Sequence, residues 1–147
     1  MKKLLPLLFT VPLLMATKPA SAFTSSIMLN QPTPTLGDTV DFTSVYPKEA
    51  HGQGRNPQYP AQPNVQVSCY QGSTLVAQEN ATTADETRIG NGWYQGLSAQ
   101  IILSQAHGLV WDGGPADCSV TLYSVSEKQG VPIFSYWAQT FFHVNGV

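Results

Sequence analysis

The feature that most constrains this chain is strict alternation around its two cysteines. In residues 64–70 (NVQVSCY), Cys69 shares one face with two valines, and in residues 118–123 (CSVTLY), Cys118 shares one face with a valine and a leucine. Because successive side chains of a strand point to opposite faces, both runs are typical of strands with one buried side. We therefore expect both cysteines on the core faces of strands.

The first 22 residues have the pattern of a secretory signal peptide. Two lysines precede a short apolar run, and a small-x-small site (ASA, residues 20–22) precedes Phe23. This pattern predicts cleavage after Ala22. A membrane anchor is the alternative, but crossing about 30 Å of hydrocarbon requires roughly 20 apolar residues, and this run has about half of that number with two prolines. We expect a secreted or periplasmic protein with one domain, residues 23–147.

Cleavage would leave an acidic chain. It removes three of the seven basic residues. Four basic and nine acidic residues remain, and the formal charge becomes −5. Such a surface argues against nucleic acid as a partner, because phosphate binding requires clustered lysine and arginine. It also disfavours an anionic membrane surface. Phe23, not a cysteine for lipid attachment, follows the cleavage site, and the chain has no apolar C-terminal tail, so we expect no membrane insertion after cleavage.

In an oxidising compartment, two cysteines in one small domain usually pair, so a Cys69–Cys118 disulfide is predicted. Closing a loop of about 50 residues would stabilise the fold by roughly 4 kcal/mol in the chain-entropy model. The alternative is a thiol nucleophile or a metal ligand, but neither cysteine has a CxxC spacing or a neighbouring histidine. The bond is expected to replace a buried apolar pair inside stacked sheets.

Period-two patterning extends along most of the remaining chain. Residues 97–103 fit a strand or one helical turn, and residues 124–131 are expected to form a polar hairpin loop. In the last strand, one face should hold Phe134, Tyr136, Ala138, Phe142 and Val144, and the other Trp137 and Phe141. Further strands are expected at 26–29, within 37–45 after a turn, and at 74–77 and 133–144. Six or seven short strands without a convincing amphipathic helix predict an all-β sandwich, with a small closed barrel as the competing architecture.

Four stretches together resemble bacterial and phage-associated immunoglobulin-like modules. They are GDTVDF (37–42), the Cys69 strand with the following YQGSTLVAQ, WDGGPADCSVTLY (111–123) and WAQTFFHVNG (137–146), and the resemblance covers roughly residues 27–146. It implies an immunoglobulin-like Greek-key β-sandwich of about seven strands. Val40 and Phe42 would lie on strand B, Cys69 on strand C and Cys118 on strand F.

The chain departs from the antibody pattern, in which the disulfide joins strands B and F and a tyrosine lies two residues before the second cysteine. Here Ala116 occupies that tyrosine position, and strand B has no cysteine. The resemblance therefore implies a bridge between neighbouring strands C and F of one sheet. It also implies a module that decorates the surface of cells or virions, or that bridges larger proteins.

Two segments break the alternation and are candidates for binding. Residues 46–64 form a proline-rich stretch that includes His51, Arg55 and Tyr59; long loops of this kind carry function or are mobile insertions. Residues 79–96 hold Trp93 and Tyr94 among glycines and polar residues. These rings fit stacking on a sugar, whereas the alternative is that Trp93 plugs a local core.

The search for catalytic and metal-binding motifs finds no GxSxG, HExxH or P-loop pattern. Asp85 and Glu86 fit a solvated acidic patch, and with Asp112 and Asp117 they are possible ligands for weakly bound calcium without loop spacing. We predict a non-enzymatic binding module without cofactor or metal, whose partner is an unknown extracellular protein or surface glycan. The alternatives are a carbohydrate-binding or small inhibitory protein that uses Trp93, Tyr94 and the 46–64 loop, and an unrecognised hydrolase.

Overall fold

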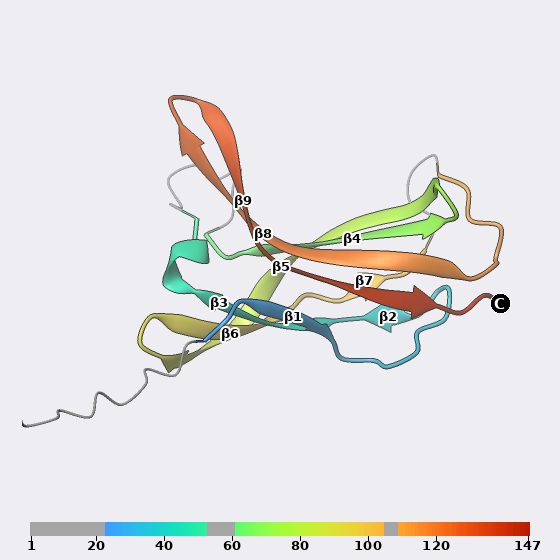
Figure 1. Ribbon diagram of the computed structural model, residues 1–147, viewed down its shortest axis with the longest axis horizontal. Helices are drawn as coiled ribbons and strands as arrows, with labels where there is room; N and C mark the ends of the chain where they lie inside the picture. The colour runs from blue at the N-terminus through green and yellow to red at the C-terminus, as the bar shows by residue number, and fades with distance from the viewer. Residues whose placement is uncertain (1–22, 53–60, 105–108) are drawn as a thin grey trace, which may run out of the picture.

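The computed structural model describes residues 23–52, 61–104 and 109–147 of the chain (Figure 1). The predicted all-β class is confirmed, because these residues form strands and one short 3-10 turn, η1, and no α-helix. The elements are β1 (Ser26–Leu29), β2 (Thr39–Val40), β3 (Phe42–Pro47), η1 (Lys48–Ala50), β4 (Asn64–Gln71), β5 (Thr74–Gly90), β6 (Trp93–Ser98), β7 (Ile101–Ile102), β8 (Ala116–Lys128) and β9 (Val131–Val144). In the described residues, no helix has the length and hydropathy required to cross a bilayer.

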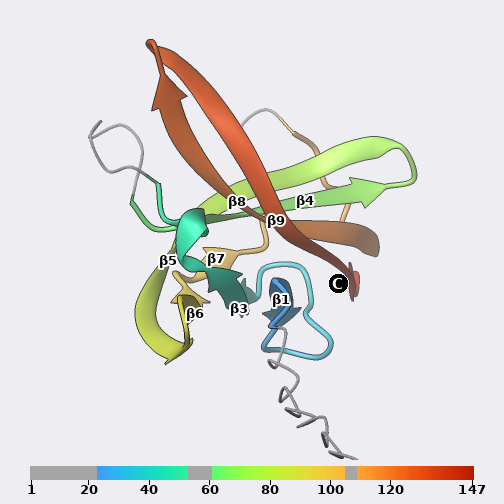
Figure 2. The same cartoon turned by 60° about the vertical axis from the view of Figure 1, so that its left-hand side comes forward.

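Seven strands form one antiparallel sheet in the order β1-β3-β6-β5-β4-β8-β9, and β2 pairs with β7 in a separate two-stranded ribbon. The long strand β5 joins two halves of the sheet. Up to Thr82 it pairs with β4, and from Thr83 onward it pairs with β6. A strand that changes partners in this way turns a corner, so β1, β3 and β6 lie across from β4, β8 and β9 (Figures 1 and 2).

The core lies between these two halves. It contains inward-facing side chains of β3, β4 and β8, among them Phe42, Val65 and Leu122, and all three are fully buried. Burying a side chain of this size stabilises a fold by roughly 1.5–3 kcal/mol. The last strand closes the core, because β9 lies against β1 as well as beside β8.

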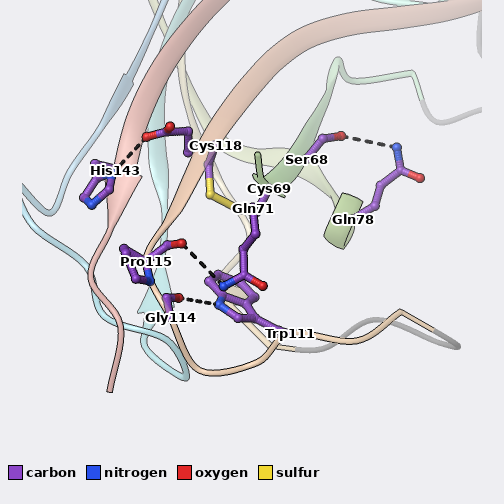
Figure 3. The surroundings of a disulfide bond; sticks show 10 residues. Ser68, Cys69, Gln71, Gln78, Trp111, Gly114, Pro115, Cys118 and His143 are labelled. Atoms are coloured by element: carbon purple, nitrogen blue, oxygen red, sulfur yellow. Dashed lines mark hydrogen bonds and ion pairs between the residues drawn. A yellow bond between two sulfur atoms is a disulfide. The ribbon is translucent and has the colours of Figure 1, made fainter. Parts of the chain in front are cut away.

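The disulfide lies within one half of the sheet. Cys69 of β4 stands directly opposite Cys118 of β8, with a Cα–Cα distance of 4.0 Å, and both residues are buried (Figure 3). The predicted pairing is confirmed, and so are the core faces of the two strands. The bond joins neighbouring strands of one sheet, as the resemblance implies, and it does not cross between the two halves.

The prediction that residues 79–96 break the strand pattern is wrong. β5 continues to Gly90 and β6 begins at Trp93, so the segment is a hairpin that turns at Asn91-Gly92. Gly92 has a φ of +74°, a left-handed conformation that glycine adopts at no steric cost in the second central position of a turn. Similarly, residues 97–103 do not form one element, because β6 ends at Ser98 and β7 covers only Ile101–Ile102.

The predicted hairpin loop over residues 124–131 is also wrong. β8 runs to Lys128 and β9 starts at Val131, so only Gln129 and Gly130 form the turn. Both have positive φ values, 54° and 78°, the geometry of the tight turns that continue the twist of a hairpin. The polar residues before the turn therefore belong to a strand.

A bulge in β9 changes which side chains share a face. Leu122 pairs with Ala138 but Tyr123 pairs with Tyr136, which leaves Trp137 as an extra residue. A shift of one residue sends the side chains that follow to the opposite face. Ala138, Phe142 and Val144 contact the core as predicted. Phe134 and Tyr136 do not share their face, because Trp137 turns inward and its indole N–H donates to Ser124 Oγ at 2.9 Å.

Candidate functional site

Two segments that were predicted separately as binding regions meet at one end of the molecule. β3 pairs with β6 so that Tyr46 lies opposite Tyr94 and Pro47 lies opposite Trp93. The turn η1 then brings the ring of His51 to 4.7 Å from that of Tyr94, edge to face. The structure thus brings together three of the predicted site residues, His51, Trp93 and Tyr94. The other two, Arg55 and Tyr59, lie outside the described residues.

We call this region the aromatic end and define it by Tyr46, His51, Glu86, Trp93 and Tyr94. The carboxylate of Glu86 lies at its centre. One oxygen accepts a hydrogen bond from the Tyr46 hydroxyl at 2.8 Å, and the other lies 2.9 Å from His51 Nε2. Glu86 was expected in a solvated acidic patch with Asp85. That expectation is wrong for Glu86, whose half-buried carboxylate is bonded on both oxygens.

The second ring nitrogen of His51 is also engaged. Nδ1 lies 3.0 Å from the carbonyl oxygen of Lys48, which can only accept a hydrogen bond. Both ring nitrogens therefore lie within hydrogen-bond distance of oxygen atoms, one of η1 and one of β5. These two contacts fix the orientation of the His51 ring and hold η1 against Tyr94.

Tyr46 is fully buried. Burial raises the pKa of its phenol above the ordinary value, and the neighbouring Glu86 carboxylate raises it further. The hydroxyl consequently stays protonated at physiological pH and acts as a donor, not as a nucleophile. Its position also requires a glycine at residue 96, because a Cβ there would lie 2.6 Å from the Tyr46 hydroxyl oxygen.

A pocket of about 560 Å³ adjoins the aromatic end. The backbone N–H of Lys48 donates to the Gly92 carbonyl at 2.7 Å and holds η1 against the β5–β6 turn. The Trp93 ring lines this pocket and also packs on Phe23, with ring centroids 5.8 Å apart. The full lining is Pro47, Lys48, Glu49, Arg88, Asn91, Gly92, Trp93 and Tyr94. The pocket thus combines two aromatic rings with cationic, anionic and amide side chains.

The remaining acidic candidates lie elsewhere. Asp112 accepts hydrogen bonds from the Gln71 side chain and the Gly114 backbone N–H, and these bonds lower the pKa of its carboxyl. It therefore stabilises the turn before β8. Asp117 pairs with His143 at 2.8 Å on the exposed surface. The described residues contain no group of three or more histidine, cysteine or acidic side chains that can hold a metal ion.

Residues that the sequence did not single out complete the site. Tyr46 and Arg88 come from near the ends of β3 and β5, where alternation alone does not distinguish a site residue from a surface residue, whereas Lys48 of η1 belongs to the proline-rich stretch already predicted as a binding segment. The Asn91-Gly92 turn was the available signal, because it predicts a hairpin and thereby places Trp93 at the start of a strand. No protein-family model and no curated protein matches this chain.

Proposed function

We propose that this chain is a secreted, non-catalytic immunoglobulin-like module that binds an extracellular protein or surface ligand through the aromatic end. The strand order supports the immunoglobulin-like class. In such sandwiches, one sheet has the strand order ABED and the other the order C′CFG. The order β1-β3-β6-β5 corresponds to ABED, and the order β5-β4-β8-β9 corresponds to C′CFG if the long strand β5 supplies both D and C′. The disulfide supports export, because such bonds persist in oxidising compartments.

The observation that carries the binding role is the convergence of two segments on one pocket. Trp93 and Tyr94 of β6 meet Lys48 of η1 and Arg88 of β5 there. Pockets that combine aromatic surface with a few polar groups are the usual form of ligand sites.

The test compares partner capture by matched variants. Arg88 and Lys128 are both exposed cations, but only Arg88 lines the pocket. We expect Arg88→Ala to lose partners that the wild-type protein captures from its native extracellular medium, and Lys128→Ala, with the same change in charge, to keep them. Equal capture by both variants would rule out the aromatic end as the binding site.

A carbohydrate is the second candidate ligand, because the Trp93 ring lines a pocket that also offers charged and amide groups. The chain has three tryptophans, so intrinsic fluorescence reports on all of them. If a sugar stacks on Trp93, glycans that score on an array should change the fluorescence of the wild-type protein and leave that of Trp93→Phe unchanged. A response that persists in Trp93→Phe would place sugar binding elsewhere.

A further inference from the structure

The last strand has an open edge. β9 has β8 on one side and ends the order of the seven-stranded sheet. Beyond its C-terminal end, Asn145 bonds with the segment before β2, donating to the Pro34 carbonyl and accepting from the Leu36 N–H. From Val131 to His143, no other strand of the described residues pairs with the second side of β9. β1 lies against part of β9 without pairing with it, so the backbone groups available to an additional strand are those at the projecting end of the β8–β9 hairpin (Figures 1 and 2).

Large apolar side chains line this open strand. Phe134 is 52% exposed, Tyr136 72% and Phe141 73%, and Val131 and Ile133 are exposed as well. The end of the β8–β9 hairpin projects beyond the other strands (Figures 1 and 2). Tyr123 supports the outer face, with its ring centroid 6.1 Å from that of Phe134 and 6.4 Å from that of Tyr136.

The open strand also has no charge, although the chain is acidic. Residues 131–147 contain no aspartate, glutamate, lysine or arginine, whereas the whole chain has a net charge of −2. Soluble proteins normally protect an exposed edge with charged side chains or proline. Here Pro132 is the only such feature in the exposed part of β9, and the bulge at Trp137 confines the regular edge to the residues before it.

We propose that β9 pairs antiparallel with β9 of a second copy of this chain. The occupant must be an extended strand, because only a strand matches the row of open backbone groups. It must be uncharged and apolar, and a second β9 has both properties and brings no like charges together. In such a dimer, a two-fold axis passes through the two copies of Ser135. Phe134 of each copy then lies opposite Tyr136 of the other copy, and Pro132 lies outside these two pairs.

The proposal is tested by the mass of the purified protein in sedimentation equilibrium. The wild type should be a dimer. Tyr136→Lys and Tyr136→Glu should each weaken the dimer at least about tenfold, because residue 136 of one copy is the diagonal neighbour of residue 136 of the other, about 7–8 Å away, and the two like charges repel. A mixture of the two variants should restore a heterodimer, since the charges are then opposite. The control is Met28→Lys, which adds the same charge to an exposed side chain of β1, the other edge strand.

Each outcome decides the proposal. A monomeric wild type would overturn it, and so would a dimer that survives both Tyr136 variants but not Met28→Lys. Restoration of the dimer in the mixture would also show that the single variants had folded, because an unfolded chain has no β9 edge to pair. Failure of the mixture to dimerise, with both variants retaining the β-strand circular dichroism of the wild type, would exclude this axis.

Discussion

The two ends of the molecule are held together by different chemistry. At one end, the Cys69–Cys118 bond ties β4 to β8, and the Trp111 indole donates to the Gly114 carbonyl at 2.7 Å beside it (Figure 3). At the aromatic end, hydrogen bonds link Tyr46 and His51 to Glu86. A covalent bond restricts the unfolded chain, whereas a polar network stabilises only the folded state and depends on protonation. The two ends should therefore respond to different treatments.

Loss of the disulfide should have the largest effect. The double variant Cys69→Ala/Cys118→Ala is expected to reduce the free energy of unfolding by roughly 4 kcal/mol, because the unfolded chain regains the entropy of an open loop. Denaturant unfolding of the oxidised wild type and the variant measures this difference. A loss well under 1 kcal/mol would show that the unfolded chain is already restricted at this point.

A methyl group at residue 96 should have the next largest effect. Gly96→Ala is expected to reduce the free energy of unfolding by about 1–3 kcal/mol, because the new Cβ would overlap the Tyr46 hydroxyl oxygen. The same substitution in a Tyr46→Phe background should cost less, since that oxygen is gone. Thermal unfolding of the four proteins forms a double-mutant cycle, and strict additivity would contradict the proposed contact.

Alkaline pH should weaken the aromatic end specifically. Since the folded-state pKa of Tyr46 is raised above the unfolded value of about 10, its contribution is complete below pH 10. Above that, the unfolded state loses the proton first, and stability falls by about 1.4 kcal/mol per pH unit until the folded group also ionises. Tyr46→Phe should flatten the curve of unfolding free energy against pH, and the cysteine double variant should not.

Part of that alkaline slope should persist in Tyr46→Phe. Burial and the neighbouring Tyr136 raise the pKa of Tyr123 as well, so this residue contributes in the same direction. A curve for Tyr46→Phe that coincides with the wild type would show that the Tyr46 phenol does not control stability at high pH.

The smallest effect is expected at the exposed pair of Asp117 and His143. Their side chains are 90% and 56% exposed, although their 2.8 Å separation resembles the contact between His51 and Glu86. Exposed ion pairs contribute less than about 1 kcal/mol. Asp117→Asn should leave the free energy of unfolding almost unchanged, whereas Glu86→Gln should reduce it measurably. Equal effects would show that burial does not distinguish the two pairs.

Much of the candidate site could be anticipated, but its organisation could not. His51, Trp93 and Tyr94 stood out as residues in irregular or aromatic segments, and they are neighbours in the fold. Glu86, which holds Tyr46 and His51 in place, is separated from them by 40 and 35 positions. No local pattern indicates that these residues meet, because their contact depends on the register between β3 and β6 and on the path of β5.

What the sequence determined by itself is local. Alternation placed Cys69 and Cys118 on core faces and made the chain all-β, because the two-residue period of a strand is written directly in the order of side chains. The tertiary structure alone decided the register that places Cys69 directly opposite Cys118, and the bulge at Trp137 that turns Phe134 and Tyr136 outward. These features depend on how strands far apart in the chain are aligned, and alignment is set by the packing of the whole core rather than by any single strand.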